Sequence, residues 1–220
     1  YFQHLESKEA SFTDGAWFEA SSSLDAAGIF EAMARLDAGG VSETLRVWGD
    51  KSPAYRTDLP LLARLFPNSR VLHVIRDVRD VCLSAQMAWG AHPLRTAQTW
   101  ASDIETCRAD SVELGHRHYL EVQYEALLDN PKHEFSKVCD FLDLEFSADM
   151  LKLSGPVDPL GQTADAREVV AHNKGHWKEA LPTDTRTQIE GIAGTVMNAC
   201  GYPLEFGEPQ RAPLSSAHLG

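Results

Sequence analysis

The sequence predicts a layered α/β fold built on a mainly parallel central sheet. Short apolar segments alternate with amphipathic helical segments of about 10 to 18 residues, as in a parallel sheet with helices on its faces. The segment 71–75, Val-Leu-His-Val-Ile, is almost unbroken in apolar character, which is typical of a central strand covered on both faces. A chain of 220 residues with 43% hydrophobic content is long enough for one such domain.

The individual elements follow from apolar spacing and from residues that start or stop helices. The expected strands are 45–48, 71–75 and 119–123. The expected helices are 24–36, 59–65, 77–90 with Asp77 as its cap, 96–114, 130–142 opened by Asn130-Pro131, and 183–200. The segment 154–173 is rich in Gly, Pro and Asp and is expected to form a long loop.

Composition excludes several classes of protein. The net charge of −12 disfavours general nucleic-acid binding. No apolar run is long enough to span a membrane, and the amino terminus lacks a secretory signal pattern. Four well-separated cysteines without a CxxC motif indicate buried thiols, so we expect a cytoplasmic protein. Residues 1–3, Tyr-Phe-Gln, match the end of a tag-protease site, which leaves residues 4–220 as a single domain.

Polar residues follow the expected strands, where ligands bind in open α/β sheets. Asp50-Lys51-Ser52 follows the first strand, Arg76-Asp77 the second, and Tyr124-Glu125 the third. Because the carboxyl ends of parallel strands share one edge of the sheet, these side chains are expected to converge. The sequence therefore predicts a ligand site at this edge.

Arg76 and Ser84 are predicted to bind a phosphate group. Arg76 leaves the tip of the central strand, and Ser84 lies about two turns into the next helix. A guanidinium binds phosphate with two parallel donors, a hydroxyl adds another, and the helix start adds backbone N–H groups. In the alternative, Arg76 pairs with Asp77, Asp80 or Glu125, and Ser84 faces its own helical turn.

Lys51 and Tyr124 are further candidates. A lysine at a strand end can stabilise charge on a leaving oxygen, whereas an ordinary surface lysine would pair with Asp50. The ring of Tyr124 can pack on a purine while its hydroxyl binds a phosphate or a ribose. The alternative for Tyr124 is a core tyrosine.

The basic segment 172–178, His-Asn-Lys-Gly-His-Trp-Lys, carries Lys174 and Gly175, which could close over a bound nucleotide. His172 and His176 have the spacing of metal ligands, but no third ligand is nearby in sequence and Gly175 weakens the helix that would align them, so no metal is expected. The sequence contains no GxSxG, no GxGxxG after a strand and no HExxH. The motifs of the common serine hydrolases, dinucleotide-binding proteins and zinc proteases are thus missing, which excludes these interpretations.

Taken together, four segments resemble the sulfotransferases that use 3′-phosphoadenylyl sulfate (PAPS), closest to the branch with bacterial and tyrosyl-protein enzymes. They are WGDKSPAY (48–55), LARLFPNSRVLHVIRDVRDVCLSA (62–85), VQYEALLDNP (122–131), and NKGHWKEAL with GYP (173–181, 201–203). They occur in the family's order and cover most of residues 45–203. The resemblance implies a three-layer α/β fold related to the P-loop nucleotide kinases.

The resemblance also implies roles for residues. Arg76 and Ser84 would bind the 3′-phosphate of PAPS, Tyr124 would contact the nucleotide, and the Lys174-Gly175 turn would close on the phosphate side. Lys51 would assist the transfer. The implied reaction moves a sulfuryl group to a hydroxyl or amine of a small-molecule, carbohydrate or peptide acceptor and leaves 3′,5′-adenosine bisphosphate (PAP).

One family element does not occur in the printed sequence. Members begin with a strand and a P-loop-like turn of the type PRSGTT, which binds the 5′-phosphosulfate. Where some members have a histidine base, this chain has Pro53, and the remaining candidate bases are Glu6, Glu9, Glu19 and Glu43. We expect that the printed chain lacks its amino-terminal portion; the alternative is a non-catalytic α/β module that binds a nucleotide or a partner. A kinase of similar fold would need a GKS/T turn and an acidic magnesium site, and neither is found.

Overall fold

The computed structural model describes residues 25–37, 47–152 and 173–207. The chain divides into two compact units, Tyr1–Asn68 and Ser69–Gly220, and each is described by itself. Within the described residues, no helix has both the length and the apolar character needed to cross a membrane.

The first unit contains the helix α3 (Ala26–Asp37), the 3-10 helix η2 (Pro53–Thr57) and the helix α4 (Leu59–Leu65). The Asp25 carboxylate accepts a hydrogen bond from the Gly28 N–H at 2.8 Å, so it caps the start of α3. The rings of Phe30, Trp48 and Phe66 pack together with centroids 5.6–6.0 Å apart. The two helices predicted here are confirmed.

The predicted strand 45–48 lies partly outside the described residues. Its described part, Val47 and Trp48, is not in a strand.

The second unit contains two strands, β1 (Val71–Ile75) and β2 (Tyr119–Gln123), which pair in parallel with Val71 opposite Tyr119 and Ile75 opposite Gln123. The chain crosses from β1 to β2 through the helices α5 (Val78–Trp89) and α6 (Pro93–Leu114). A parallel pair requires such a long crossover. Both strands were predicted with these bounds.

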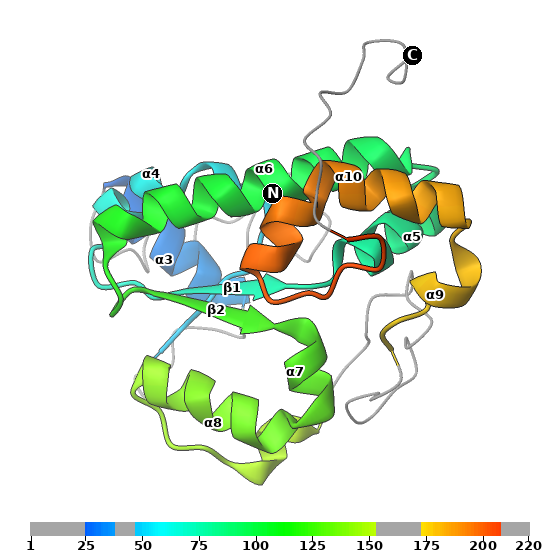
Figure 1. Cartoon of the computed structure of the whole chain (residues 1–220). Coiled ribbons are helices and arrows are strands. Elements are labelled where there is room, and N and C mark those ends of the chain that lie inside the picture. The colour runs from blue at the N-terminus through cyan, green and yellow to red at the C-terminus, as the bar shows by residue number, and fades with distance from the viewer. Residues whose placement is uncertain (1–24, 38–46, 153–172, 208–220) are drawn as a thin grey trace. The chain divides into compact units, whose positions relative to one another are not determined.

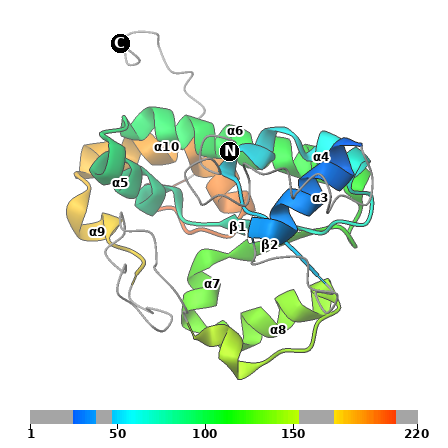
Figure 2. The ribbon, with the colours of Figure 1, turned by 180° about the vertical axis from the view of Figure 1, so that it is seen from behind.

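The later elements of this unit are α7, α8, η3, α9 and α10. They span Tyr124–Asp129, Pro131–Leu142, Ala148–Leu151, Trp177–Ala180 and Thr183–Ala199. Figures 1 and 2 show α6 and α10 on one side of the two strands and α7 and α8 on the other. The predicted α/β class is therefore confirmed.

The core of the second unit lies between β1 and the helices α5, α6 and α10. Its members are buried, with relative exposures of 9% or less, and include Ile75, Val78, Trp100, Ile189 and Met197. On the opposite face of β1, Leu72 is 38% and Val74 53% exposed. The expectation that both faces of this strand are covered is therefore wrong for that face.

Helix boundaries differ from the predictions where a cap is unusual or an element is short. Helix α6 begins at Pro93 because the imidazole of His92 accepts a hydrogen bond from the Leu94 N–H at 3.3 Å. Helices α7 and α9 were not predicted, since six and four residues are too few to show a helical period. The predicted loop 154–173 lies outside the described residues except for Asn173.

Candidate functional site

The turn between β1 and α5 presents Arg76, and the side chains of Trp100 and Glu125 hold its backbone. The Trp100 indole N–H donates to the Arg76 carbonyl at 3.0 Å. The Glu125 carboxylate accepts from the Asp77 N–H at 2.9 Å and from the Tyr202 hydroxyl at 2.8 Å. Burial raises the pKa of the Tyr202 hydroxyl, and the hydrogen bond to Glu125 raises it further, so this hydroxyl stays protonated and donates. The position of Arg76 at the strand end is thereby fixed.

The Arg76 guanidinium lies among groups contributed by α7 and by the segment before α9. Its centre lies 4.9 Å from the centroid of the Tyr124 ring, a cation–π distance. Its Nη2 donates to the Asn173 carbonyl at 3.3 Å, and the Asn173 amide donates to the Tyr124 hydroxyl at 2.8 Å. Among the described residues, the buried Nε of Arg76 has no hydrogen-bond partner. The structure thus brings together Arg76 and Tyr124, as predicted, and adds Asn173.

The segment 173–177 is attached to α5 through Asp80. The Asp80 carboxylate accepts from the Gly175 N–H at 2.5 Å and from the Trp177 N–H at 3.1 Å. Gly175 has a φ of 74°, a left-handed conformation that glycine adopts without a steric cost. Figures 1 and 2 both show α9 beside the first turns of α5.

A buried network of charges lies behind this attachment. Arg79, with a side chain only 2% exposed, pairs with Asp77 at 2.6 Å and with Glu190 at 2.7 Å. Its guanidinium lies 3.7 Å from the centroid of the Trp177 ring. Burial by itself lowers the pKa of Arg79, but the hydrogen bonds and charges of Asp77 and Glu190 outweigh it, so the pKa is raised and the arginine stays charged.

Lys174 and Gly175 lie in this region as predicted. The Lys174 ammonium forms an ion pair with Asp129 at the end of α7, and Asp129 is 65% exposed. An exposed pair of this kind contributes little stability and exchanges readily for another anion.

Ser84 forms no hydrogen bond or ion pair with this cluster among the described residues, and Lys51 lies in the other unit. Ser84 lies exposed on α5, and its role stays a prediction. Lys51 belongs to the first unit and is exposed, while Asp50, its alternative partner, accepts a hydrogen bond from the Tyr55 hydroxyl. Lys51 likewise stays a predicted member of the site. The candidate bases Glu6, Glu9, Glu19 and Glu43 lie outside the described residues.

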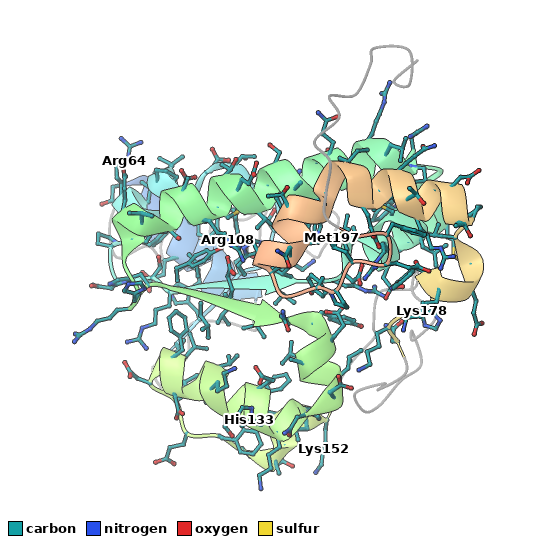
Figure 3. The ribbon with its side chains drawn as sticks, in the orientation of Figure 1. Arg64, Arg108, His133, Lys152, Lys178 and Met197 are labelled. Carbon is teal, nitrogen blue, oxygen red and sulfur yellow. The ribbon has the colours of Figure 1, made fainter. Side chains whose placement is uncertain are left out.

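A second polar network lies between β1, β2 and α6. Arg108 reaches from α6 to β2 (Figure 3) and binds the Glu121 carboxylate through two N–H groups, both at 2.8 Å. The hydrogen bond from Arg108 holds the pKa of Glu121 below its ordinary value. The Tyr119 hydroxyl lies 2.6 Å from the His73 imidazole, whose pKa burial lowers. This network ties the sheet to α6 and is separate from the Arg76 cluster.

Sequence comparison identifies the family of the chain. Residues 2–148 match the sulfotransferase family. The chain belongs to the sulfotransferase family. A "Putative protein-tyrosine sulfotransferase" of Caenorhabditis briggsae is 25% identical over 175 residues, which are 73% of this chain and 62% of that protein. The protein of the same name from Caenorhabditis elegans is 26% identical over 177 residues, 73% of this chain and 67% of that protein. The chain thus spans 62% and 67% of the lengths of these two relatives.

Solved structures agree with the α/β sulfotransferase fold. The sulfotransferase domain from the curacin biosynthetic pathway matches 70% of this chain and 62% of its own, with 23% identity and a TM-score of 0.55. The sulfotransferase domain from the Synechococcus PCC 7002 olefin synthase matches 92% of this chain and 80% of its own, with 22% identity and a TM-score of 0.54. At these identities the likeness shows the fold of the chain alone.

Five residues that position the site were not assigned a role from the sequence. They are Asp80, Trp100, Glu125, Asn173 and Tyr202. Asp80 and Glu125 had been named only as alternative partners of Arg76, and Asn173 lies in the segment 172–178 that was expected to close over a nucleotide. In the described part of the chain, no three His, Cys, Asp or Glu side chains gather as a metal site.

Proposed function

We propose that the protein transfers a sulfuryl group from PAPS to a hydroxyl or amine of an acceptor and releases PAP. The acceptor oxygen or nitrogen forms a bond to sulfur, the bond from sulfur to the bridging phosphate oxygen breaks, and the acceptor proton passes to a base. Membership of the sulfotransferase family supports the transfer. The donor, the class of acceptor and the residue roles are part of the proposal.

The observation that carries the proposal is the environment of Arg76. Its guanidinium is fixed at the strand end, lies against Tyr124 and keeps a buried Nε without a partner among the described residues. A buried donor without a partner costs free energy, and an anion bound there would remove that cost. A phosphate at Arg76 would also lie next to the aromatic ring of Tyr124, which suits a purine nucleotide, and we assign Lys174 to the same site because it follows Asn173.

The remaining predicted residues have roles in the same scheme. Ser84 adds a hydroxyl donor to the 3′-phosphate, and Lys51 neutralises charge on the leaving oxygen. Because sulfuryl transfer spreads charge over three oxygens, the protein mainly positions and neutralises the reacting groups. The protein-tyrosine name of the nematode relatives makes a peptide the first acceptor to test, with small molecules and carbohydrates next. The four cysteines are buried, which supports the proposal of a cytoplasmic location.

Calorimetry with PAP tests the assignment. Replacing Arg76 by alanine removes at least one charge-assisted hydrogen bond of about 1.5–3 kcal/mol, so PAP should bind at least about 10- to 150-fold more weakly. Arg64→Ala, which removes an exposed arginine of α4, is the matched control and should bind PAP like the wild type. Equal affinity of the wild type and Arg76→Ala would remove the phosphate role of Arg76.

Turnover of labelled PAPS separates the enzyme from the alternative, a non-catalytic nucleotide-binding module. The enzyme should release PAP at a rate that depends on the acceptor. PAP binding that needs Arg76, together with no PAPS turnover by the natural protein with any acceptor class, would favour the module.

A further inference from the structure

We propose that Asp80 is a positioning residue of the nucleotide site, which holds the segment 173–177 so that this segment and Arg76 together receive the 3′-phosphate. This inference rests on the proposed function. It assigns to a buried carboxylate the task of setting the geometry of a site that the carboxylate itself need not touch.

The contacts of Asp80 support this assignment. Its side chain is 1% exposed, and each of its two oxygens accepts a backbone N–H of the segment, from Trp177 to Oδ1 and from Gly175 to Oδ2. Bonds from backbone N–H groups to a buried carboxylate are stronger than those to a neutral acceptor. Asp80 therefore fixes the backbone of the segment against the first turn of α5.

The segment fixed in this way carries two groups of the site. Asn173 accepts a hydrogen bond from Arg76 and donates one to the Tyr124 hydroxyl. Lys174 follows directly. On the other side of the segment, the buried ring of Trp177 packs against the Arg79 guanidinium at 3.7 Å. Without Asp80, the packing of Trp177 would hold one end of the segment, while Asn173 would lose its alignment with Arg76 and Tyr124.

Asp80 also forms an ion pair with Arg76, as the alternative from the sequence expected, so its positioning role has to be distinguished from that of a competing counter-ion. The Asp80 Oδ2 lies 3.9 Å from the Arg76 Nη2, so the two form an ion pair without a hydrogen bond. Both Asp80 oxygens are engaged by the backbone, and the Nε of Arg76 has no partner among the described residues. The carboxylate thus orders the site while leaving the guanidinium able to bind a phosphate. A counter-ion would instead compete with the phosphate, so its removal would tighten nucleotide binding.

Asp80→Asn tests the two roles against each other. Asparagine keeps the shape of the side chain but turns one acceptor into a donor that faces a backbone N–H, so the segment loses one of its two attachments. We expect the affinity for PAP to fall at least tenfold. The affinity for adenosine 5′-phosphate, which lacks the 3′-phosphate, should change less than threefold. Asp140→Asn makes the same change on an exposed site of α8 and should leave both affinities as in the wild type.

Calorimetry with both nucleotides either supports or overturns the positioning role of Asp80, whatever its result. Tighter or unchanged PAP binding by Asp80→Asn would overturn the positioning role, and so would an equal loss for both nucleotides, which would indicate general damage. If Arg76→Ala also left PAP binding unchanged, the proposed function itself would fail. If Asp80→Asn folds poorly, Asp80→Ser, which keeps an oxygen acceptor without an amide donor, is measured with the same nucleotides, and the same selective loss for PAP is expected.

Discussion

Replacing Glu190 by glutamine is predicted to destabilise the protein strongly, although Glu190 lies outside the Arg76 cluster. Its side chain is 3% exposed and accepts from Arg79 at 2.7 Å. The same carboxylate also accepts from the backbone N–H groups of Glu205 and Phe206, at 2.9 and 3.0 Å. It therefore joins α5, α10 and the chain after α10.

The expected loss follows from these contacts. Removing one partner of a buried ion pair costs about 3–5 kcal/mol. The Glu190→Gln variant keeps one oxygen acceptor, and Arg79 keeps its pair with Asp77, so the expected loss of unfolding free energy is about 2–4 kcal/mol. Part of this cost arises because the amide donor of glutamine would face the two backbone N–H groups. For a chain of this size, such a loss lowers the Tm by about 5–15 °C.

Urea unfolding followed by tryptophan fluorescence measures this change. The midpoint should fall while the slope with urea stays the same, because the surface exposed on unfolding does not change. Glu113→Gln, at an exposed position of α6, makes the same chemical change and should alter the free energy of unfolding by less than about 0.5 kcal/mol. A Glu190→Gln variant as stable as that control would refute the reasoning on the buried network.

Three further predictions concern the site and the sheet. Gly175→Ala places a side chain at a φ of 74°, where a Cβ would meet nothing within 4 Å. The cost is therefore backbone strain of about 1–2 kcal/mol, seen as weaker PAP binding in calorimetry; affinity equal to that of the wild type would contradict it. Arg108 lowers the pKa of Glu121, so this carboxylate stabilises the fold fully above the ordinary value of 4.5 and progressively less as the pH falls through the lowered pKa. Glu121→Gln should flatten the acid side of a plot of unfolding free energy against pH, and an unchanged slope would argue against it. Ser84→Ala should weaken PAP binding about threefold to tenfold, as expected for loss of one hydrogen bond. If PAP affinity does not fall, Ser84 has no part in the site.

Local sequence determined the strands and most helices of this protein. The apolar run 71–75 and the segment 119–123 became β1 and β2 with the predicted bounds. The Asp77 carboxylate caps α5 by accepting from the Arg79 N–H at 2.9 Å. These features depend on neighbours in the chain, so they can be read from spacing and caps.

The short elements depended on contacts that no local pattern reports. Helix α9 has four residues and is held by Asp80 from a distant part of the chain. The exposure of Val74 also followed from which helices cover the sheet, because an apolar strand has the same sequence pattern whether one face or both are covered.

The sequence by itself named Arg76, Tyr124, Lys174 and Gly175, since their residue types and their resemblance to the sulfotransferases indicate phosphate chemistry. Two features were decided by the tertiary structure alone. Both oxygens of Asp80 accept hydrogen bonds from backbone N–H groups far away in sequence, and Arg79 is buried between Asp77 and Glu190. The reason is physical: a carboxylate or a guanidinium is written identically in the sequence whether water or a buried partner satisfies it, and only long-range packing makes that choice.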